Sequence, residues 1–121
     1  RTQQKILIVD DDPLVAKSLA RMLNEEQVMI ASNGVTAIET LKTYPFDLIL
    51  SDVMMPEMDG PTLYTEIERL FPQYRERFIF ITGAAKGDQV THALAMSGRL
   101  VLNKPITKKQ LMSVVNRITR S

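Results

Sequence analysis

Polar side chains that can bind a cation or take part in group transfer follow four separate apolar runs of the chain. Asp10, Asp11 and Asp12 come directly after ILIV, Asp52 comes after LILS, Thr82 after FIFI, and Lys104 two residues after LVL. Carboxylates that lie close together repel one another, and a hard divalent cation such as Mg²⁺ relieves this repulsion. A lysine adds a movable positive charge, and a threonine hydroxyl can donate to phosphate oxygens. The set indicates Mg²⁺-dependent phosphoryl transfer with an aspartate nucleophile.

The apolar runs themselves predict the strands of a parallel sheet, over residues 5–9, 27–31, 48–50, 78–81 and 100–102. Apolar residues at helical spacing predict helices at about residues 13–24, 37–41, 61–71, 90–96 and 111–118. Strands that alternate with helices predict one α/β domain whose sheet is covered by helices on both faces. Such a sheet gathers the carboxyl ends of its strands at one edge, so the polar residues above are expected to lie together there.

Composition narrows the class of protein. The chain has 121 residues, 45% of them apolar and 24% charged, which is typical of one folded domain. The absence of cysteine excludes a disulfide framework and fits the cytoplasm. No apolar run is long enough to cross a bilayer, and a net charge of +1 gives no general attraction to nucleic acid, so neither membrane insertion nor direct nucleic-acid contact is expected. Because the sequence starts at Arg1 rather than at methionine, residues 1–121 are expected to be a single domain excised from a longer protein.

Charge is unevenly distributed near the end of the chain. No acidic residue follows Asp88, whereas the last quarter contains Arg99, Lys104, Lys108, Lys109, Arg117 and Arg120. A solvated basic helix face is the commoner explanation of such a run, and a docking surface for an acidic partner is the other.

Four segments, KILIVDDDP, DLILSDVMMPEMDG, FIFITG and LVLNKPI, resemble in order and spacing the receiver domain of two-component response regulators. The resemblance covers essentially the whole chain and implies the flavodoxin-like (βα)5 fold, an α/β sheet with strand order 2-1-3-4-5. It implies a domain that takes a phosphoryl group from a phosphohistidine of a sensor histidine kinase or histidine phosphotransfer domain. Such a domain promotes its own phosphorylation but is not a free-standing metabolic enzyme. A homodimer is a further expectation.

The same resemblance implies a role for each candidate residue. Asp52 corresponds to the phosphoacceptor. Asp11 and Asp52, with the backbone carbonyl of Met54, correspond to the direct Mg²⁺ ligands, and Asp10 to the acid that holds the ion, usually through water. Thr82 corresponds to the hydroxyl that moves toward the phosphoryl group, and Lys104 to its counter-charge. The Lys104–Pro105 peptide is expected to be cis.

One position departs from the usual receiver pattern, and two others bear on the lifetime of the phosphoryl group. The aromatic residue that often lies three residues before the lysine is Val101 here, so the usual switch of threonine and aromatic is in doubt. Output is then expected through a backbone shift of the helix at about Lys86 to Met96, or the domain mainly relays phosphate. Met54 and Ala84 occupy positions that influence access of water to the phosphoryl group. Because apolar Met54 cannot orient water, slow self-dephosphorylation is expected.

Two other functions remain as alternatives. In a haloacid-dehalogenase-like phosphotransferase Asp10 would be the nucleophile and Asp12 the general acid, but no later acid cluster is present and Asp52 is left without a role. A mononucleotide binder would need hydroxyls and glycine after the first strand, where this chain has carboxylates. His92 is expected to be structural or exposed. Within the receiver family, Val101 favours the receiver of a hybrid sensor kinase, and a stand-alone regulator or part of a transcription factor is the alternative.

Overall fold

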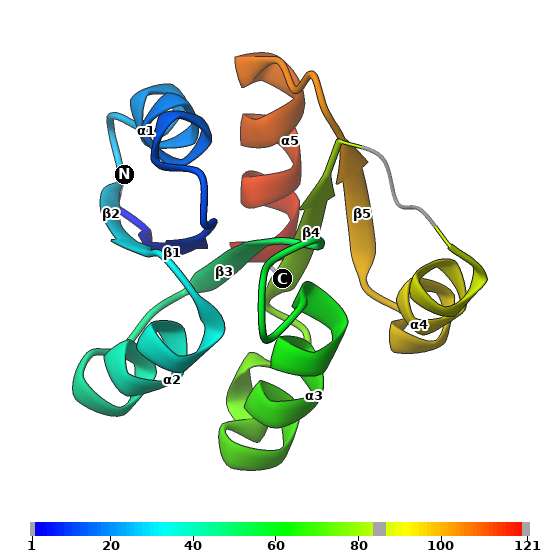
Figure 1. Cartoon of the computed structure of the whole chain (residues 1–121). Helices are drawn as coiled ribbons and strands as arrows, with labels where there is room; N and C mark the ends of the chain where they lie inside the picture. Colours follow the sequence, from blue (N-terminus) through cyan, green and yellow to red (C-terminus); the bar gives the residue numbers. More distant parts are fainter. Residues whose placement is uncertain (1, 84–86, 120–121) are drawn as a thin grey trace.

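Five parallel strands form one sheet in the order β2-β1-β3-β4-β5, as predicted (Figure 1). The computed structural model describes residues 2–83 and 87–119. The strands are β1 Lys5–Val9, β2 Gln27–Ala31, β3 Leu48–Asp52, β4 Phe78–Thr82 and β5 Leu100–Asn103. The three last-named strands extend beyond their apolar runs, because ladder pairing continues to Asp52 opposite Ile81 and to Thr82 opposite Asn103. Asp52 and Thr82 are therefore fixed by the sheet itself.

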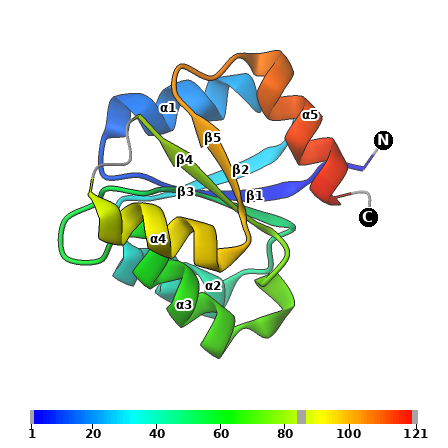
Figure 2. The same ribbon diagram turned by 90° about the vertical axis from the view of Figure 1, so that its right-hand side faces the viewer.

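Helices cover both faces of the sheet, again as predicted (Figures 1 and 2). On one face lie α1 Pro13–Met22 and α5 Lys108–Thr119; on the other lie α2 Gly34–Thr43, α3 Gly60–Leu70 and α4 Asp88–Ser97. A short 3₁₀ helix, η1 Pro72–Tyr74, follows α3 and was not predicted. Asp12 caps α1 by accepting a hydrogen bond of 2.9 Å from the backbone N–H of Leu14, and Pro13 occupies the first helical position.

Alternate side chains of the central strands enter two separate cores. Ile6 and Ile8 of β1 pack in the layer of α1 and α5, whereas Leu7 and Val9 pack in the layer of α2, α3 and α4; all four are fully buried. Burial on both faces explains why the strand is continuously apolar instead of alternating with polar residues. The two packed layers hold the carboxyl ends of β1, β3, β4 and β5 in fixed relation to one another.

Candidate functional site

Asp10, the first residue after β1, carries a buried carboxylate that is only half satisfied. Its side chain is 2% exposed, and its Oδ1 accepts a hydrogen bond of 2.9 Å from the backbone N–H of Asp12. Within the described residues, Oδ2 of Asp10 is buried and accepts no hydrogen bond. Because buried polar atoms in native proteins almost always have a partner, this oxygen indicates a site for a cation or for ordered water.

Asp52 ends β3 with its side chain 12% exposed. Its Oδ1 accepts a hydrogen bond of 2.9 Å from the backbone N–H of Val53. The loop that follows returns close to the strand, where the N–H of Gly60 donates to the carbonyl of Val53 at 2.8 Å. A Cβ atom on Gly60 would lie 2.5 Å from the carbonyl oxygen of Asp52, so only glycine fits this approach. Asp52 is therefore held rigidly at the mouth of the site.

Asp10, Asp11 and Asp52 form an acidic cluster in which one carboxylate oxygen from each residue lies within 4.8 Å of the others. Asp10 is buried, Asp52 half-buried and Asp11 exposed, so the cluster opens toward solvent on one side. Oxygen ligands around an open position are what Mg²⁺ prefers, and Oδ2 of Asp10, which accepts no hydrogen bond from the described residues, is available to such an ion. The residues present therefore fit the cation that the sequence predicts.

Lys104 lies between two acids of this cluster. Its Nζ is 3.7 Å from Oδ2 of Asp10 and 3.7 Å from Oδ1 of Asp52. Both distances exceed hydrogen-bond length, so Lys104 acts on the acids as a charge. The backbone N–H of Lys104 donates to the carbonyl of Thr82 at 2.8 Å, which joins the ends of β4 and β5. The Lys104–Pro105 peptide is cis, as predicted.

Burial has the largest effect on the pKa values of the Asp10 and Asp52 carboxyl groups. Desolvation raises the pKa of Asp10 above its ordinary value of 3.8, and the charge of Asp52 adds to this, while the backbone N–H of Asp12 and the charge of Lys104 oppose it. Desolvation also raises the pKa of Asp52, against the lowering effects of Lys104 and the N–H of Val53. The site therefore favours whatever supplies further positive charge.

Thr82 and Val101 occupy the two positions that form the threonine–aromatic switch in other receiver domains. Thr82 is 2% exposed at the end of β4. Val101 pairs with Phe80 in the sheet and packs in the same core as Val90 and Leu94 of α4. The valine lies within a packed layer and offers no aromatic ring to rotate. Ala84 and Lys86, which the sequence also singled out, lie outside the described residues, as does Arg120.

The remaining sequence candidates are not members of the cluster of carboxylates. His92 is exposed on α4, in agreement with the expectation. Met54 is 50% exposed in the loop after β3, whereas Met55 is buried. The role of the Met54 carbonyl as a ligand stays a prediction. Asp12, the general acid of the dehalogenase-like alternative, caps α1 and is not a member of the acidic cluster.

An apolar groove beside the site was not predicted. It has a volume of about 330 Å³ and is lined by Leu14, Val15, Ser18, Leu19, Met22, Lys104, Pro105 and Ile106. Leu14, next to the α1 cap, is 75% exposed. Leu14, Ser18 and Met22 are spaced four residues apart, so they lie on the same side of α1. This spacing is the sequence signal that could have predicted the α1 side of the groove.

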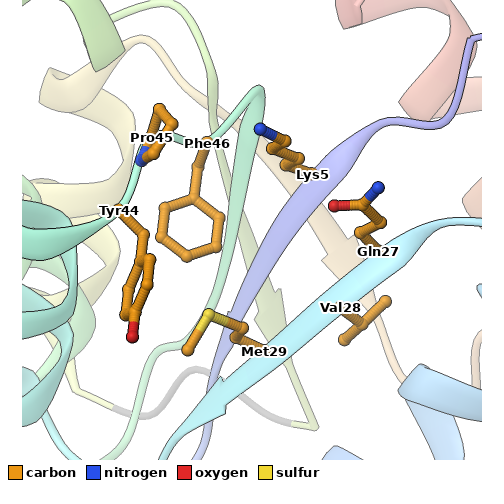
Figure 3. A pocket seen from close by; sticks show the side chains of 7 residues that line it. All are labelled: Lys5, Gln27, Val28, Met29, Tyr44, Pro45 and Phe46. Atoms are coloured by element: carbon orange, nitrogen blue, oxygen red, sulfur yellow. The ribbon is translucent and has the colours of Figure 1, made fainter.

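A second apolar pocket lies at the opposite edge of the sheet. Lys5, Gln27, Val28, Met29, Tyr44, Pro45 and Phe46 line it, at the start of β1 and β2 and just before β3 (Figure 3). Its lining contains no carboxylate. It therefore does not belong to the acidic site at the carboxyl ends of the strands.

Across the described part of the chain, no helix combines the length and the apolar character needed to span a membrane.

Comparison with protein families matches residues 6–116 to the response regulator receiver domain. Among curated proteins, sensor kinase CckA of Brucella abortus is 33% identical over 117 residues, and the histidine-protein kinase BarA of Escherichia coli K12 is 32% identical over 114 residues. Each match covers 93% of this chain but 12% of the relative, so the chain spans a small part of the length of these kinases.

Solved receiver domains of histidine kinases have the same fold. One from Syntrophus aciditrophicus superposes with a TM-score of 0.86 at 32% identity, covering 97% of this chain and 90% of the other. The receiver domain of sensor histidine kinase PA1611 from Pseudomonas aeruginosa has a TM-score of 0.86 at 26% identity, covering 99% and 100% of the two chains. That structure holds a magnesium ion coordinated in its active site cleft.

Proposed function

The chain belongs to the response regulator receiver domain family, and we propose that Asp52 is the residue on which it accepts a phosphoryl group from phosphohistidine. The protein is thus a receiver domain of two-component signalling, related to receivers of hybrid kinases. The observation that carries the proposal is the position of Asp52 at the end of β3, with two acids within 4.8 Å and the Lys104 ammonium at 3.7 Å.

The transfer is a displacement at phosphorus. A carboxylate oxygen of Asp52 forms the new P–O bond, the P–N bond of the phosphohistidine breaks, and the departing imidazole takes up a proton. Asp52 must be ionised to attack, and Lys104 favours the ionised form against the effect of burial. The N–H of Val53 fixes one carboxylate oxygen, which orients the other for attack.

The acidic cluster supports a Mg²⁺ site formed by Asp10, Asp11 and Asp52, with the Met54 carbonyl as a further ligand. Receiver domains bind Mg²⁺ in their acidic site, and the PA1611 receiver holds the ion there. When bound, the ion would neutralise the carboxylates and the phosphoryl oxygens that meet in the site. Asp10 contributes a buried negative charge. Asp11 contributes an exposed negative charge on the solvent side, from which the phosphoryl group arrives.

Thr82 and Lys104 are proposed to hold the phosphoryl group after transfer. The threonine hydroxyl can donate to one phosphoryl oxygen and the lysine can neutralise another. Val101 removes the aromatic part of the usual switch, so the output of this domain is a backbone shift near α4 or a relay of phosphate to a second histidine.

The wider context of the domain is proposed from its relatives. The matched kinases suggest the receiver of a hybrid sensor histidine kinase in the cytoplasm, with a kinase or phosphotransfer domain as its partner. Direct contact with nucleic acid is not proposed for this domain, and homodimer formation stays a prediction. The reading frame that contains these residues tests this context, because a kinase domain encoded in the same frame would establish it and a DNA-binding domain there would contradict it.

Labelling with a small phosphodonor tests the site. Acetyl phosphate and Mg²⁺ should add one phosphoryl group to the wild-type chain and none to Asp52→Ala, as measured by intact-mass spectrometry. EDTA should abolish labelling of the wild type. Labelling that persists in Asp52→Ala but is lost in Asp10→Ala would support the dehalogenase-like scheme instead.

A further inference from the structure

A buried serine lies directly before the phosphoacceptor. Apart from tyrosines, the polar side chains that are buried within the described residues are Asp10, Glu26, Ser51 and Thr82. Two of these belong to the acidic site, and Glu26 accepts a hydrogen bond of 2.9 Å from the backbone N–H of Gln4 at the opposite edge of the sheet. Ser51, fully buried next to Asp52, has no part in the mechanism described so far.

Packing alone does not explain a serine at this position. Ser51 pairs with Val9 of β1 and with Phe80 of β4, and both neighbours are fully buried in the layer of α2, α3 and α4. Ile49, two residues earlier on the same face of β3, is buried in that layer too. An apolar side chain would fill this place without the cost of burying a hydroxyl group. The hydroxyl group therefore needs another explanation, and its hydrogen bond supplies one.

One peptide group connects the Ser51 hydroxyl to the carboxylate of Asp52. The hydroxyl donates a hydrogen bond of 2.9 Å to the backbone carbonyl of Asp52. That carbonyl belongs to the same planar peptide group as the N–H of Val53. The N–H in turn donates to Oδ1 of Asp52 at 2.9 Å. A rotation of this peptide group that released the Ser51 hydroxyl would therefore also turn the N–H away from the carboxylate.

The same peptide group lies where the sheet no longer holds it on one side. Pairing of β3 with β1 ends at Ser51, opposite Val9, one residue before Asp52. On the loop side Gly60 approaches the peptide group so closely that a Cβ atom there would lie 2.5 Å from the carbonyl oxygen of Asp52. The Ser51 hydroxyl thus fixes the carbonyl from the strand side, and Gly60 limits its movement from the loop side.

We infer that Ser51 is a positioning residue for phosphoryl transfer: its hydroxyl orients the Asp52–Val53 peptide group, whose N–H holds one carboxylate oxygen of Asp52 and leaves the other directed at phosphorus. The inference rests on the function proposed for Asp52. Because Ser51 is fully buried, it does not contact the phosphodonor, and its effect passes through the peptide group. Loss of the hydroxyl therefore slows the transfer step and leaves binding of the donor unchanged.

Labelling kinetics with acetyl phosphate and Mg²⁺ test this role. In Ser51→Ala the maximal rate constant should fall by about tenfold or more, while the half-saturating concentration of acetyl phosphate stays within about twofold of the wild type. Ser51→Thr keeps a hydroxyl group on Cβ and should recover most of the lost rate. Ser97→Ala is the matched control, because it removes a serine hydroxyl that donates to the carbonyl of Leu94 at 2.6 Å, at the end of α4. It should be labelled like the wild type.

A spectroscopic measurement separates positioning from a loss of stability. The amide proton of Val53 is followed by NMR in ¹⁵N-labelled protein before any phosphodonor is added. In Ser51→Ala its resonance should move upfield and depend more steeply on temperature, because its hydrogen bond to the Asp52 carboxylate weakens. In Ser51→Thr and Ser97→Ala it should stay close to its wild-type position.

The outcomes distinguish this inference from the function on which it rests. Failure of acetyl phosphate to label the wild type would overturn the proposed function. If the wild type is labelled, a Ser51→Ala variant with the wild-type maximal rate constant would overturn the positioning role alone. The same holds if Ser51→Ala is slower but its Val53 amide is unchanged, or if a folded Ser51→Thr variant is as slow as Ser51→Ala.

Discussion

The Nζ atom of Lys104 lies 3.7 Å from the Oδ1 atom of Asp52, and 3.7 Å also separates it from Oδ2 of Asp10. One lysine thus faces two carboxylates whose burial raises their pKa. Before transfer, the positive charge of Lys104 offsets the negative charges of Asp10 and Asp52. After transfer, a phosphoryl group on Asp52 would present new negative charge to the same ammonium group.

Replacement of Lys104 should slow phosphorylation far more than it affects folding. Lys104→Met keeps most of the length of the side chain and removes its charge, so the developing negative charge on the phosphoryl group loses one of its stabilising partners. We expect labelling by acetyl phosphate to be slower by about a hundredfold. Lys108→Met, an exposed lysine four residues later, is the matched control. Equal labelling rates in Lys104→Met and the wild type would show that the ion pair has no role in transfer.

Removal of the buried charge of Asp10 should stabilise the chain when no divalent cation is present. The folded-state pKa is raised mainly by desolvation, so the folded protein binds a proton at Asp10 more tightly than the unfolded chain does. The ionised Asp10 carboxylate therefore lowers the free energy of unfolding at neutral pH. This loss of stability disappears as pH falls through the raised pKa toward 3.8, because the carboxyl group becomes neutral. We expect Asp10→Asn in EDTA at neutral pH to melt about 3–5 °C above the wild type.

The pH dependence of that difference is the informative measurement. The melting temperatures of Asp10→Asn and the wild type should converge as pH falls, because the wild-type carboxyl becomes neutral too. Glu76→Gln, which removes an exposed acid, should show no such convergence. Added Mg²⁺ should raise the melting temperature of the wild type more than that of the variant. A variant less stable than the wild type in EDTA at neutral pH would contradict the account.

Gly34 and Met58 form a contact that holds the loop after Asp52. A Cβ atom on Gly34 would lie 2.5 Å from Sδ of Met58 and 3.2 Å from its Cβ, so the start of α2 packs directly against this loop. We expect Gly34→Ala to lower the free energy of unfolding by about 1–3 kcal/mol through overpacking, measured by urea titration. Met58→Ala should relieve the crowding, so that the double variant loses less stability than the sum of the two single changes. If the loss of stability in the double variant equals the sum of the losses in the two single variants, the Gly34 and Met58 positions do not interact.

Met54 should give the phosphorylated protein a long lifetime. Its side chain is apolar and half exposed, two residues after Asp52, and it offers no group that could orient a water molecule for attack on the phosphoryl group. We expect a half-life of minutes or longer in Mg²⁺ buffer, and a several-fold shorter one in Met54→Asn, followed by loss of the phosphoryl mass with time. A half-life of seconds in the wild type would contradict this expectation.

Sequence patterns predicted the parts of the site that the sheet positions. Asp52, Thr82 and Lys104 follow apolar runs, and parallel pairing necessarily brings the ends of such runs to one edge. Asp10 was placed correctly for the same reason. The sheet order itself came from the family resemblance, because apolar runs do not specify which strands are neighbours.

Contacts between distant segments could not be predicted in this way. Nothing in three consecutive aspartates shows that Asp10 is buried, with an oxygen that accepts no hydrogen bond from the described residues, while Asp11 is exposed, since this depends on the turn between β1 and α1. Packing of Gly34 on Met58 joins segments that no local pattern connects. The groove beside Leu14 likewise exists only because α1 and the segment before α5 lie side by side.

Chemical reduction of the phosphorylated chain identifies which aspartate carries the phosphoryl group. The chain is phosphorylated with acetyl phosphate and Mg²⁺, the acyl phosphate is reduced with borohydride to homoserine, and the site is located by tandem mass spectrometry of peptides. We expect homoserine at position 52 and at no other aspartate. Homoserine at position 10, or none at 52 while the intact chain carries the phosphoryl mass, would contradict it.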